Sequence, residues 1–313
     1  MKFLLTAINA KFIHSNPSIY SLRAGVGEKL QPYVELAEFT INESLESILE
    51  GIWKRQPKVI GFSCYIWNWK LIREILTELP KILPDTEIWL GGPEVTYDGP
   101  GLLREFPQVT GIMVGEGEVT FREVLGQYVR EAESTGQSEQ QPEPDSIEQQ
   151  AADRTGTVAG KSVAERFGQI PGLCLASGYT APRELTDLTT LPFLYEDMEP
   201  FTNRIIYYET SRGCPYRCSY CLSSIDKKVR LRDIDVVKRE LQFFLDQNVK
   251  QVKFIDRTFN CDHKHAMEIW EYIYKHDNGV TNFHFEISAD ILREEEIVLL
   301  NRFRPGLAQL EIG

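Results

Sequence analysis

Three cysteines in one short stretch are the residues of this chain best suited to chemistry. Cys214, Cys218 and Cys221 follow the spacing C-x3-C-x2-C. A structural zinc site needs four ligands, usually as two separated pairs, and only Cys261 and His263 could join from farther along the chain. A ferredoxin loop would instead run C-x2-C-x2-C with a fourth cysteine before proline. Three thiolates on a 4Fe-4S cube leave one iron without a protein ligand, so the spacing favours a cluster that binds a substrate or cofactor.

The rest of the composition describes the setting of this motif. The remaining cysteines, Cys64, Cys174 and Cys261, are scattered singly, which argues against a disulfide framework and indicates a reducing cytoplasm. The 313 residues are 42% hydrophobic and 26% charged, as expected of a globular protein with room for two domains. The formal net charge of -12 argues against nucleic acid as a partner. No run approaches the length of a membrane span, so no membrane partner is expected.

The first 130 residues alternate short apolar runs with amphipathic helical patterns. Strands are predicted over 3–8, 34–41, 59–63, 87–90 and 111–114, and helices over 19–30, 44–54, 69–81 and 119–130. This order predicts an α/β domain with a Rossmann-like parallel sheet, which binds ligands beyond the carboxyl ends of its strands. Small residues follow those ends, namely Ser63, Gly91, Gly92, Gly115 and Gly117. Such glycines either let backbone approach a ligand or only make tight turns, and both interpretations stay open.

The composition changes after this domain. Residues 131–168 are rich in Glu, Gln, Ser and Gly, which predicts a disordered linker or insertion. Residues 169–204 read as a connecting arm with one hairpin strand. From 205 to 313 the order is that of a βα barrel, with strands at 205–210, 252–256, 283–288 and 308–312 and helices at 233–246, 264–276 and 294–303. Because the chain ends after the fourth strand, with no element to cover its edge, a truncated partial barrel is expected.

The cysteine motif directly follows the first strand of the predicted barrel, and Tyr220 precedes its last cysteine. Arg212, Gly213 and Pro215 surround the cysteines in a similar way to one known family, and the chain resembles the radical S-adenosylmethionine (radical SAM) superfamily. The resemblance implies that the three cysteines ligate a 4Fe-4S cluster and that SAM chelates the fourth iron. One electron from the cluster would cleave SAM to methionine and a 5'-deoxyadenosyl radical. It also implies an electron donor such as flavodoxin or ferredoxin.

The first domain is similar to the cobalamin-binding domain that one subgroup of this superfamily carries ahead of its barrel. The resemblance implies ligand-facing loops at Ser63, Gly91, Gly92, Gly115, Glu116 and Gly117. The loop after the first strand, INAKFIHSNPS, departs from the D-x-H-x-x-G pattern that supplies an axial histidine to cobalt in other cobalamin enzymes. A lone loop histidine such as His14 is more often a solvated or capping residue, so no histidine from this loop is expected below the cobalt.

Polar residues at the ends of the barrel strands are candidate contacts for SAM, together with Tyr220. Asp256 in FIDRTFN is similar to family segments that approach the methionine part of SAM. Glu286 and Ser288 alternate on the third strand and share one face, where they would meet the ribose or the substrate. The structural alternatives are that Asp256 caps the next helix and that Glu286 pairs with a cation inside the barrel.

These residues together predict a cytoplasmic radical SAM enzyme that cleaves SAM reductively at a 4Fe-4S cluster. With cobalamin as a second cofactor, methyl transfer to an unidentified substrate is the most economical reaction. Two alternatives stay open: a radical SAM enzyme of another reaction type with a degenerate cobalamin domain, and a non-catalytic cobalamin- or cluster-binding sensor. The intact cysteine motif counts against a mere binding module.

Overall fold

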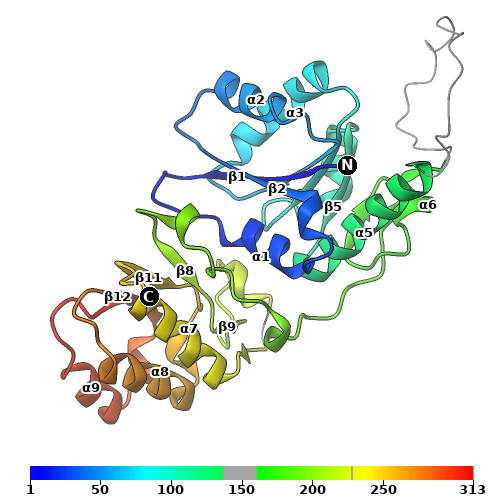
Figure 1. Cartoon of the computed structure of the whole chain (residues 1–313). Helices are drawn as coiled ribbons and strands as arrows, with labels where there is room; N and C mark the ends of the chain where they lie inside the picture. Colours follow the sequence, from blue (N-terminus) through cyan, green and yellow to red (C-terminus); the bar gives the residue numbers. More distant parts are fainter. Residues whose placement is uncertain (137–160, 227, 313) are drawn as a thin grey trace, which may run out of the picture. The chain divides into compact units, whose positions relative to one another are not determined.

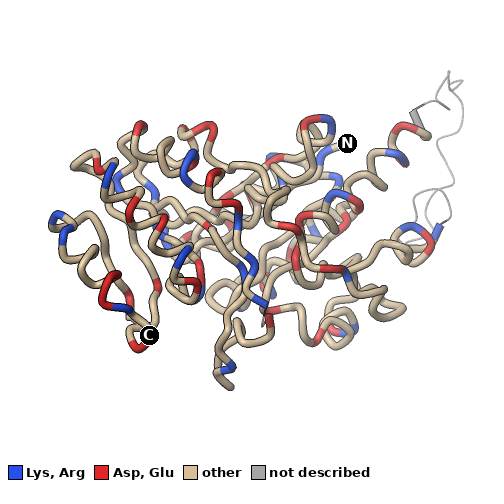
Figure 2. The backbone as a smooth tube through the Cα atoms, turned by 90° about the horizontal axis from the view of Figure 1, so that it is seen from below, with Lys and Arg blue, Asp and Glu red and all other residues tan. Residues whose placement is uncertain are grey.

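The structure, a computed structural model, describes residues 1–136, 161–226 and 228–312 and divides the chain into two compact units. The first unit comprises Met1–Phe12 and Asn16–Thr186, and the second comprises Ile13–Ser15 and Asp187–Gly313. The boundary therefore falls inside the arm expected over 169–204. Acidic and basic residues are interspersed along both units (Figure 2). No helix in the described part of the chain is long and apolar enough to cross a membrane.

A seven-stranded sheet with the order β2-β1-β3-β4-β5-β6-β7 forms the centre of the first unit. Its first five strands are parallel, and β6 and β7 add an antiparallel hairpin to the edge. All seven residues of β1 are buried, as expected of a parallel strand covered on both faces. The predicted Rossmann-like sheet is thus confirmed. The strands are β1 (Phe3–Asn9), β2 (Val34–Thr40), β3 (Val59–Ser63), β4 (Glu87–Gly91), β5 (Val109–Met113), β6 (Leu173–Leu175) and β7 (Gly178–Tyr179).

Helices cover both faces of this sheet and form a separate core on each (Figure 1). Ile48, Ile72 and Leu102 pack on one face, and Ile19 and Phe121 pack on the other. The helices are α1 (Pro17–Gly25), α2 (Leu45–Trp53), α3 (Trp69–Ile82), α4 (Gly99–Glu105), α5 (Gly117–Gly136) and α6 (Val163–Phe167). The sequence pattern did not predict α4, because proline and two glycines in its first turn are typical of a loop.

Both ends of the segment expected as a linker over 131–168 are helical. The helix α5 runs past the expected boundary, and α6 lies inside it. The guanidinium of Arg166 is buried between Glu87 and Glu131, with N–O distances of 2.9 Å to each carboxylate. The buried guanidinium of Arg166 therefore anchors α6 to the first unit. The polar composition of this segment does not reveal such an ion pair, so the helix was not predicted. Residues 137–160, the centre of the expected linker, lie outside the described residues.

The second unit contains a four-stranded parallel sheet with the order β13-β12-β11-β8. Strand neighbours follow chain order and helices connect them, so the predicted βα order of the second unit is confirmed. The parallel strands are β8 (Ile206–Tyr208), β11 (Gln251–Phe254), β12 (Asn282–Ile287) and β13 (Ala308–Ile312), and the helices are α7 (Ile234–Asp246), α8 (His263–Lys275) and α9 (Glu294–Leu300).

Shorter elements complete the second unit. The strand expected over 205–210 ends at Tyr208, and the chain then forms β9 (Ser211–Arg212), which pairs antiparallel with β10 (Arg230–Leu231). The loop between β9 and β10 contains the cysteine motif. The short 3-10 helices of the chain are η1 (Gln31–Tyr33), η2 (Leu188–Thr190), η3 (Glu199–Phe201), η4 (Leu222–Ser224), η5 (Phe259–Cys261) and η6 (Ala289–Ile291).

The segment Ile13–Ser15 supplies a backbone partner just before β8. The backbone N–H of Ile205 donates to the carbonyl oxygen of Ile13 at 2.9 Å, and Ser15 Oγ donates to the carbonyl of Ile205 at 3.1 Å. His14 and Ile205 form a parallel bridge. Three residues from the start of the chain therefore satisfy backbone groups that an edge strand would otherwise expose.

Candidate cofactor sites

The cysteine loop starts from a glycine that no other residue can replace without strain. Gly213 has a φ of +96°, and a Cβ atom built there would lie 2.4 Å from the carbonyl oxygen of Lys228. Beyond it, the backbone N–H of Cys214 donates to the carbonyl of Asp226 at 3.0 Å. The backbone N–H of Cys221 donates to the carbonyl of Cys218 at 3.1 Å. The loop is thus held closed at its base by backbone hydrogen bonds.

The three cysteines differ in exposure along the loop. Cys214 is 8% exposed, Cys218 is half-buried and Cys221 is exposed, and none forms a disulfide. Within the described ranges, the structure does not bring these thiols together into a group spaced to hold a metal ion. The donor set nevertheless fits an iron–sulfur cluster, because three free thiols share one tight loop.

The segment that follows β11 holds the chain that leads into this loop. Asp256 is 1% exposed, and its carboxylate accepts from Thr210 N at 3.1 Å, Thr210 Oγ1 at 2.7 Å and Ser211 Oγ at 2.5 Å. Burial raises the pKa of Asp256 to about 6, although these hydrogen bonds act to lower it. The alternative prediction that Asp256 caps the next helix is wrong. Asp262 does so, by accepting from the backbone N–H of His265.

Two further side chains of this segment contact neighbouring strand ends. Thr258 Oγ1 lies 3.4 Å from Cys214 Sγ, and both residues are buried. The side chain of Asn260 donates to the carbonyl of Ser288 at 2.8 Å and accepts from its N–H at 2.9 Å. Ser288 Oγ donates to Asp290 at 2.5 Å. The sequence places Thr258 and Asn260 beside Asp256 in FIDRTFN, but it does not predict their partners Cys214 and Ser288, which are distant in sequence.

The other residues predicted to contact SAM lie apart from this buried segment. Lys253 Nζ lies 3.4 Å from Glu286 and 3.1 Å from Glu311, which is the pairing with a cation named as the alternative for Glu286. Tyr220 is 91% exposed. His14 Nδ1 lies 2.5 Å from the hydroxyl of Tyr207, a partner that the sequence did not predict. Contact of Tyr220, Glu286 and Ser288 with SAM stays a prediction.

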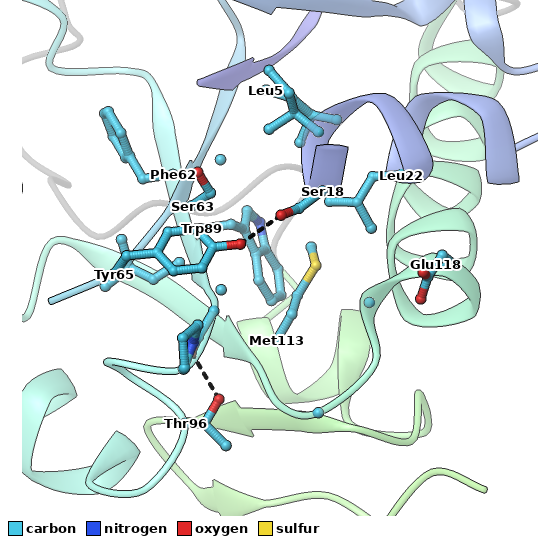
Figure 3. Close-up of a pocket in the computed structure, with 18 of the residues that line it drawn as sticks. Leu5, Ser18, Leu22, Phe62, Ser63, Tyr65, Trp89, Thr96, Met113 and Glu118 are labelled. Atoms are coloured by element: carbon cyan, nitrogen blue, oxygen red, sulfur yellow. Dashed lines mark hydrogen bonds between the residues drawn. The ribbon is translucent and has the colours of Figure 1, made fainter. Parts of the chain in front are cut away.

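The first unit contains a cavity of about 350 Å³ at the carboxyl ends of its parallel strands (Figure 3). Its lining is mainly apolar and includes Leu5, Phe62, Trp89 and Met113. The order of the sheet reverses between β1 and β3, and open α/β sheets bind their ligands beside such a reversal. The position and the lining are therefore those of a ligand site.

Five of the six residues predicted to face cobalamin line this cavity, namely Ser63, Gly91, Gly92, Gly115 and Gly117. Gly92 has a φ of +107°, and an added Cβ would lie 2.5 Å from the carbonyl oxygen of Cys64. Gly115 has a φ of +80°, and an added Cβ would meet nothing within 4 Å. Glu116 is not among the lining residues, and its carboxylate accepts from the backbone N–H of Thr186 at 2.6 Å.

Polar side chains lining the cavity include Ser18, Ser63 and Tyr65. The hydroxyls of Ser18 and Tyr65 are hydrogen-bonded to each other at 2.6 Å (Figure 3). Asn16 Nδ2 donates to Ser63 Oγ at 3.2 Å, whereas the buried Oδ1 of Asn16 has no hydrogen-bond partner among the described residues. Asn16 is not among the lining residues, so within the described part of the chain this acceptor is buried behind Ser63 and does not face the cavity.

The indole of Trp89 lines the cavity (Figure 3), and hydrogen bonds hold its position. Its Nε1 donates to the hydroxyl of Tyr128 at 2.8 Å, and this hydroxyl donates to Glu87 at 2.6 Å. Burial and the nearby Glu87 raise the pKa of Tyr128, so the phenol remains a donor. Arg166 completes the chain by pairing with Glu87. The position of this indole therefore depends on α6, which the sequence did not predict.

Comparison with known proteins assigns both units. Residues 4–125 match the family model of the B12 binding domain, and residues 208–312 match that of the Radical SAM superfamily. The 2-(S-pantetheinyl)-carbapenam-3-carboxylate methyltransferase of Streptantibioticus cattleyicolor is 27% identical over 228 residues, covering 69% of this chain and 29% of its own. The cobalamin-dependent radical SAM methyltransferase TokK of Streptomyces tokunonensis is 27% identical over 215 residues, covering 65% and 28%.

A third curated relative is named as a cyclase and not as a methyltransferase. The anaerobic magnesium-protoporphyrin IX monomethyl ester cyclase of Rubrivivax gelatinosus is 25% identical over 284 residues, covering 86% of this chain and 46% of its own. The chain thus spans less than half the length of these three relatives.

Solved structures share the fold over nearly the whole chain. The radical SAM methyltransferase TsrM from Kitasatospora setae, with tryptophan and a SAM analogue bound, has a TM-score of 0.66 at 18% identity and covers 100% of this chain and 59% of its own. The cobalamin-dependent radical enzyme OxsB, with aqua-cobalamin and SAM bound, has a TM-score of 0.70 at 17% identity, covering 99% and 43%. With one domain matched in each unit, the chain belongs to the radical SAM proteins that carry an N-terminal cobalamin-binding domain.

Proposed function

We propose that this chain forms the cofactor-binding part of an enzyme that cleaves SAM reductively and transfers a methyl group to a substrate. The observation that carries the proposal is the presence of two sites in one chain. A closed loop with three free thiols follows the first barrel strand, and a mainly apolar cavity lies at the strand ends of a B12 binding domain. Two of the curated relatives described above are named as methyltransferases.

The residues of the second unit fit a 4Fe-4S cluster with SAM. Cys214, Cys218 and Cys221 would hold the cluster, which supplies the electron that cleaves SAM when both are bound. Gly213 lets the loop turn sharply at the first cysteine, and Asp256 fixes the chain before it. Asp256 would act on the cofactor through the protein, since its oxygens already accept three hydrogen bonds.

Three other side chains are proposed as direct contacts of SAM in the second unit, namely Tyr220, Glu286 and Ser288. Glu286 and Ser288 alternate at the end of β12 and share a face of the sheet. Tyr220 lies in the cysteine loop itself, where its exposed ring is free to cover a bound cofactor. A ferredoxin or flavodoxin of the cytoplasm is the proposed electron donor.

The residues of the first unit fit one end of cobalamin. A cavity of about 350 Å³ is too small for the corrin ring with its amide side chains, but an apolar aromatic group fits it, and the benzimidazole base of cobalamin is such a group. Ser63, Gly92 and Gly115 would let this group approach the backbone. Glu116 would act by fixing the connecting arm at Thr186.

A second candidate is a radical SAM reaction other than methyl transfer. The cyclase of Rubrivivax gelatinosus favours it, because that protein matches a larger share of this chain than the two methyltransferases do. The substrate is unidentified under both candidates.

Anaerobic reconstitution of the chain with iron, sulfide and hydroxocobalamin tests the proposal. Retained corrin after gel filtration, together with release of 5'-deoxyadenosine from SAM under dithionite, is the expected result. Deoxyadenosine without retained corrin would favour a degenerate cobalamin domain, and cofactor retention without SAM cleavage would favour a sensor. Transfer of the isotopically labelled methyl group of SAM to the retained corrin would favour methyl transfer over the second candidate.

A further inference from the structure

One side chain outside the cysteine motif contacts a thiol within it. Thr258 Oγ1 lies 3.4 Å from Cys214 Sγ, and the two residues are 7% and 8% exposed. Cys218 is half-buried and Cys221 is exposed, so water has access to both. Cys214 is thus the thiol of the loop for which the protein, and not the solvent, has to supply a hydrogen-bond donor.

The position of the Thr258 hydroxyl is fixed by its neighbours in the chain. Asp256, two residues earlier, accepts three hydrogen bonds from Thr210 and Ser211. The carbonyl oxygen of Thr258 accepts from the backbone N–H of Cys261 at 3.0 Å, which closes the turn η5. A β-branched side chain also has few rotamers. The hydroxyl is therefore preorganised beside the sulfur.

The direction of this hydrogen bond follows from the chemistry of the ligand. Between a thiol and a hydroxyl, either atom could be the donor. A cysteine that ligates iron is a thiolate without a proton, so the hydroxyl of Thr258 must donate. A hydrogen bond to a sulfur ligand stabilises the more negative, reduced cluster more than the oxidised one, and burial strengthens the effect.

We propose that Thr258 is a positioning residue that donates a hydrogen bond to the Cys214 ligand and raises the reduction potential of the cluster. The inference rests on the proposed function, because it requires a cluster on this loop. Its consequence is that Thr258 sets how easily an electron donor reduces the cluster, and so how readily SAM is cleaved.

Reduction potentials of reconstituted variants test this role without any substrate. Thr258→Val keeps the shape of the side chain and removes the donor, whereas Thr258→Ser keeps the donor. We expect a lower midpoint potential for T258V in a redox titration followed by electron paramagnetic resonance, and a potential close to that of the wild type for T258S. Thr6→Val is the matched control, because Thr6 is fully buried in the first unit and its hydroxyl has no hydrogen-bond partner among the described residues.

The outcomes separate this inference from the function on which it rests. Equal potentials for T258V and the wild type would overturn it, and so would the same shift in T258S as in T258V. Loss of the cluster in T258V but not in T258S would support the positioning role, whereas loss in T258S, which keeps the donor, would show that the hydroxyl is not what holds the ligand and would overturn it. Failure of the wild-type chain itself to take up iron and sulfide would instead reject the cluster.

Discussion

The cysteines of this chain are chemically unequal, and their surroundings explain which ones suit iron. Cys261 lies in the turn η5 near Asp256, Asp262 and Cys214, and burial together with these neighbours raises the pKa of its thiol to about 11. Because a metal binds the thiolate, the raised pKa makes ligation by Cys261 more costly than ligation by an ordinary thiol. Cys214, Cys218 and Cys221 lie in one loop whose base is closed by backbone hydrogen bonds.

Replacing any one of Cys214, Cys218 and Cys221 by alanine should therefore abolish the cluster, because two thiolates are too few for a cube that leaves one iron to SAM. Cys261→Ala is the matched control and should retain it. Iron and sulfide counts with the visible charge-transfer band after anaerobic reconstitution report each variant. Complete cluster loss in C261A would mean four protein ligands, and the radical SAM assignment of the loop would give way to an electron-transfer site.

Asp256 should make the stability of the second unit depend on pH. Its pKa is about 6 in the folded chain against 3.8 for the free side chain, so folding favours the protonated form. This stabilisation is present below about pH 4 and is lost as the pH rises through 6, a change of about 3 kcal/mol. Asp256→Asn cannot titrate, so the difference in unfolding free energy between wild type and variant should shift by about this amount between pH 4 and pH 7.

Urea unfolding followed by circular dichroism at several pH values measures that difference. Other carboxylates titrate in the same range in both proteins and cancel in the comparison. A difference that is constant from pH 4 to pH 7 would mean that the carboxyl of Asp256 is not held in its buried, hydrogen-bonded position.

At the scale of elements, the strand ends of the first unit combine strain with open space. Gly115 has a φ of +80° at the end of β5, and a Cβ there would project into unfilled space at the cavity. Gly27 has a similar φ of +77° and equally open surroundings, but it lies after α1 and does not line the cavity. An alanine at either position would strain the backbone, but only an alanine at position 115 would also occupy space at the cavity.

Gly115→Ala should weaken cobalamin retention, whereas Gly27→Ala should not. Both substitutions should lower the unfolding free energy by about 1 kcal/mol, because both place a Cβ at positive φ. Equilibrium dialysis against hydroxocobalamin measures binding, and urea unfolding measures the strain. Equal cobalamin affinity in both variants would remove Gly115 from the proposed site.

The sequence predicts the elements whose signal is local. The buried parallel strand β3 is a nearly continuous apolar run, and the exposed strand β13 alternates apolar with polar residues, so the predictions 59–63 and 308–312 match both strands in full. The helix α6 and the short helix α4 were missed, because a buried ion pair and a Pro-Gly start override composition. The cavity glycines can be predicted because they directly follow strands in the sequence. The hydrogen bonds of Asn16 and Thr258 cannot, because their partners are 47 and 44 residues away.

At the scale of the whole molecule, the two units have separate cores, and tryptophan is distributed unevenly between them. Trp53, Trp67, Trp69 and Trp89 belong to the first unit, and Trp270 belongs to the second. Intrinsic fluorescence therefore reports mainly on unfolding of the first unit, while circular dichroism reports on both. The chain itself thus distinguishes which unit a ligand stabilises.

Hydroxocobalamin should raise the urea midpoint of the fluorescence transition. Free ligand at one hundred times its dissociation constant stabilises the folded state by about 2.7 kcal/mol, since it binds only the folded domain. The same titration with Gly115→Ala should give a smaller shift. An unchanged midpoint at saturating cobalamin would show that the first unit does not bind it.

The contact between Arg166 and Glu131 has a practical consequence for engineering. It ties α6 to α5, so both ends of the stretch between Gly136 and Lys161 are anchored to the same domain. Once the ends of a loop are fixed, doubling its length changes the closure free energy by only about 0.6 kcal/mol. The stretch is therefore a suitable place to graft an affinity tag or a fluorescent reporter, away from both cofactor sites along the chain and without altering either terminus.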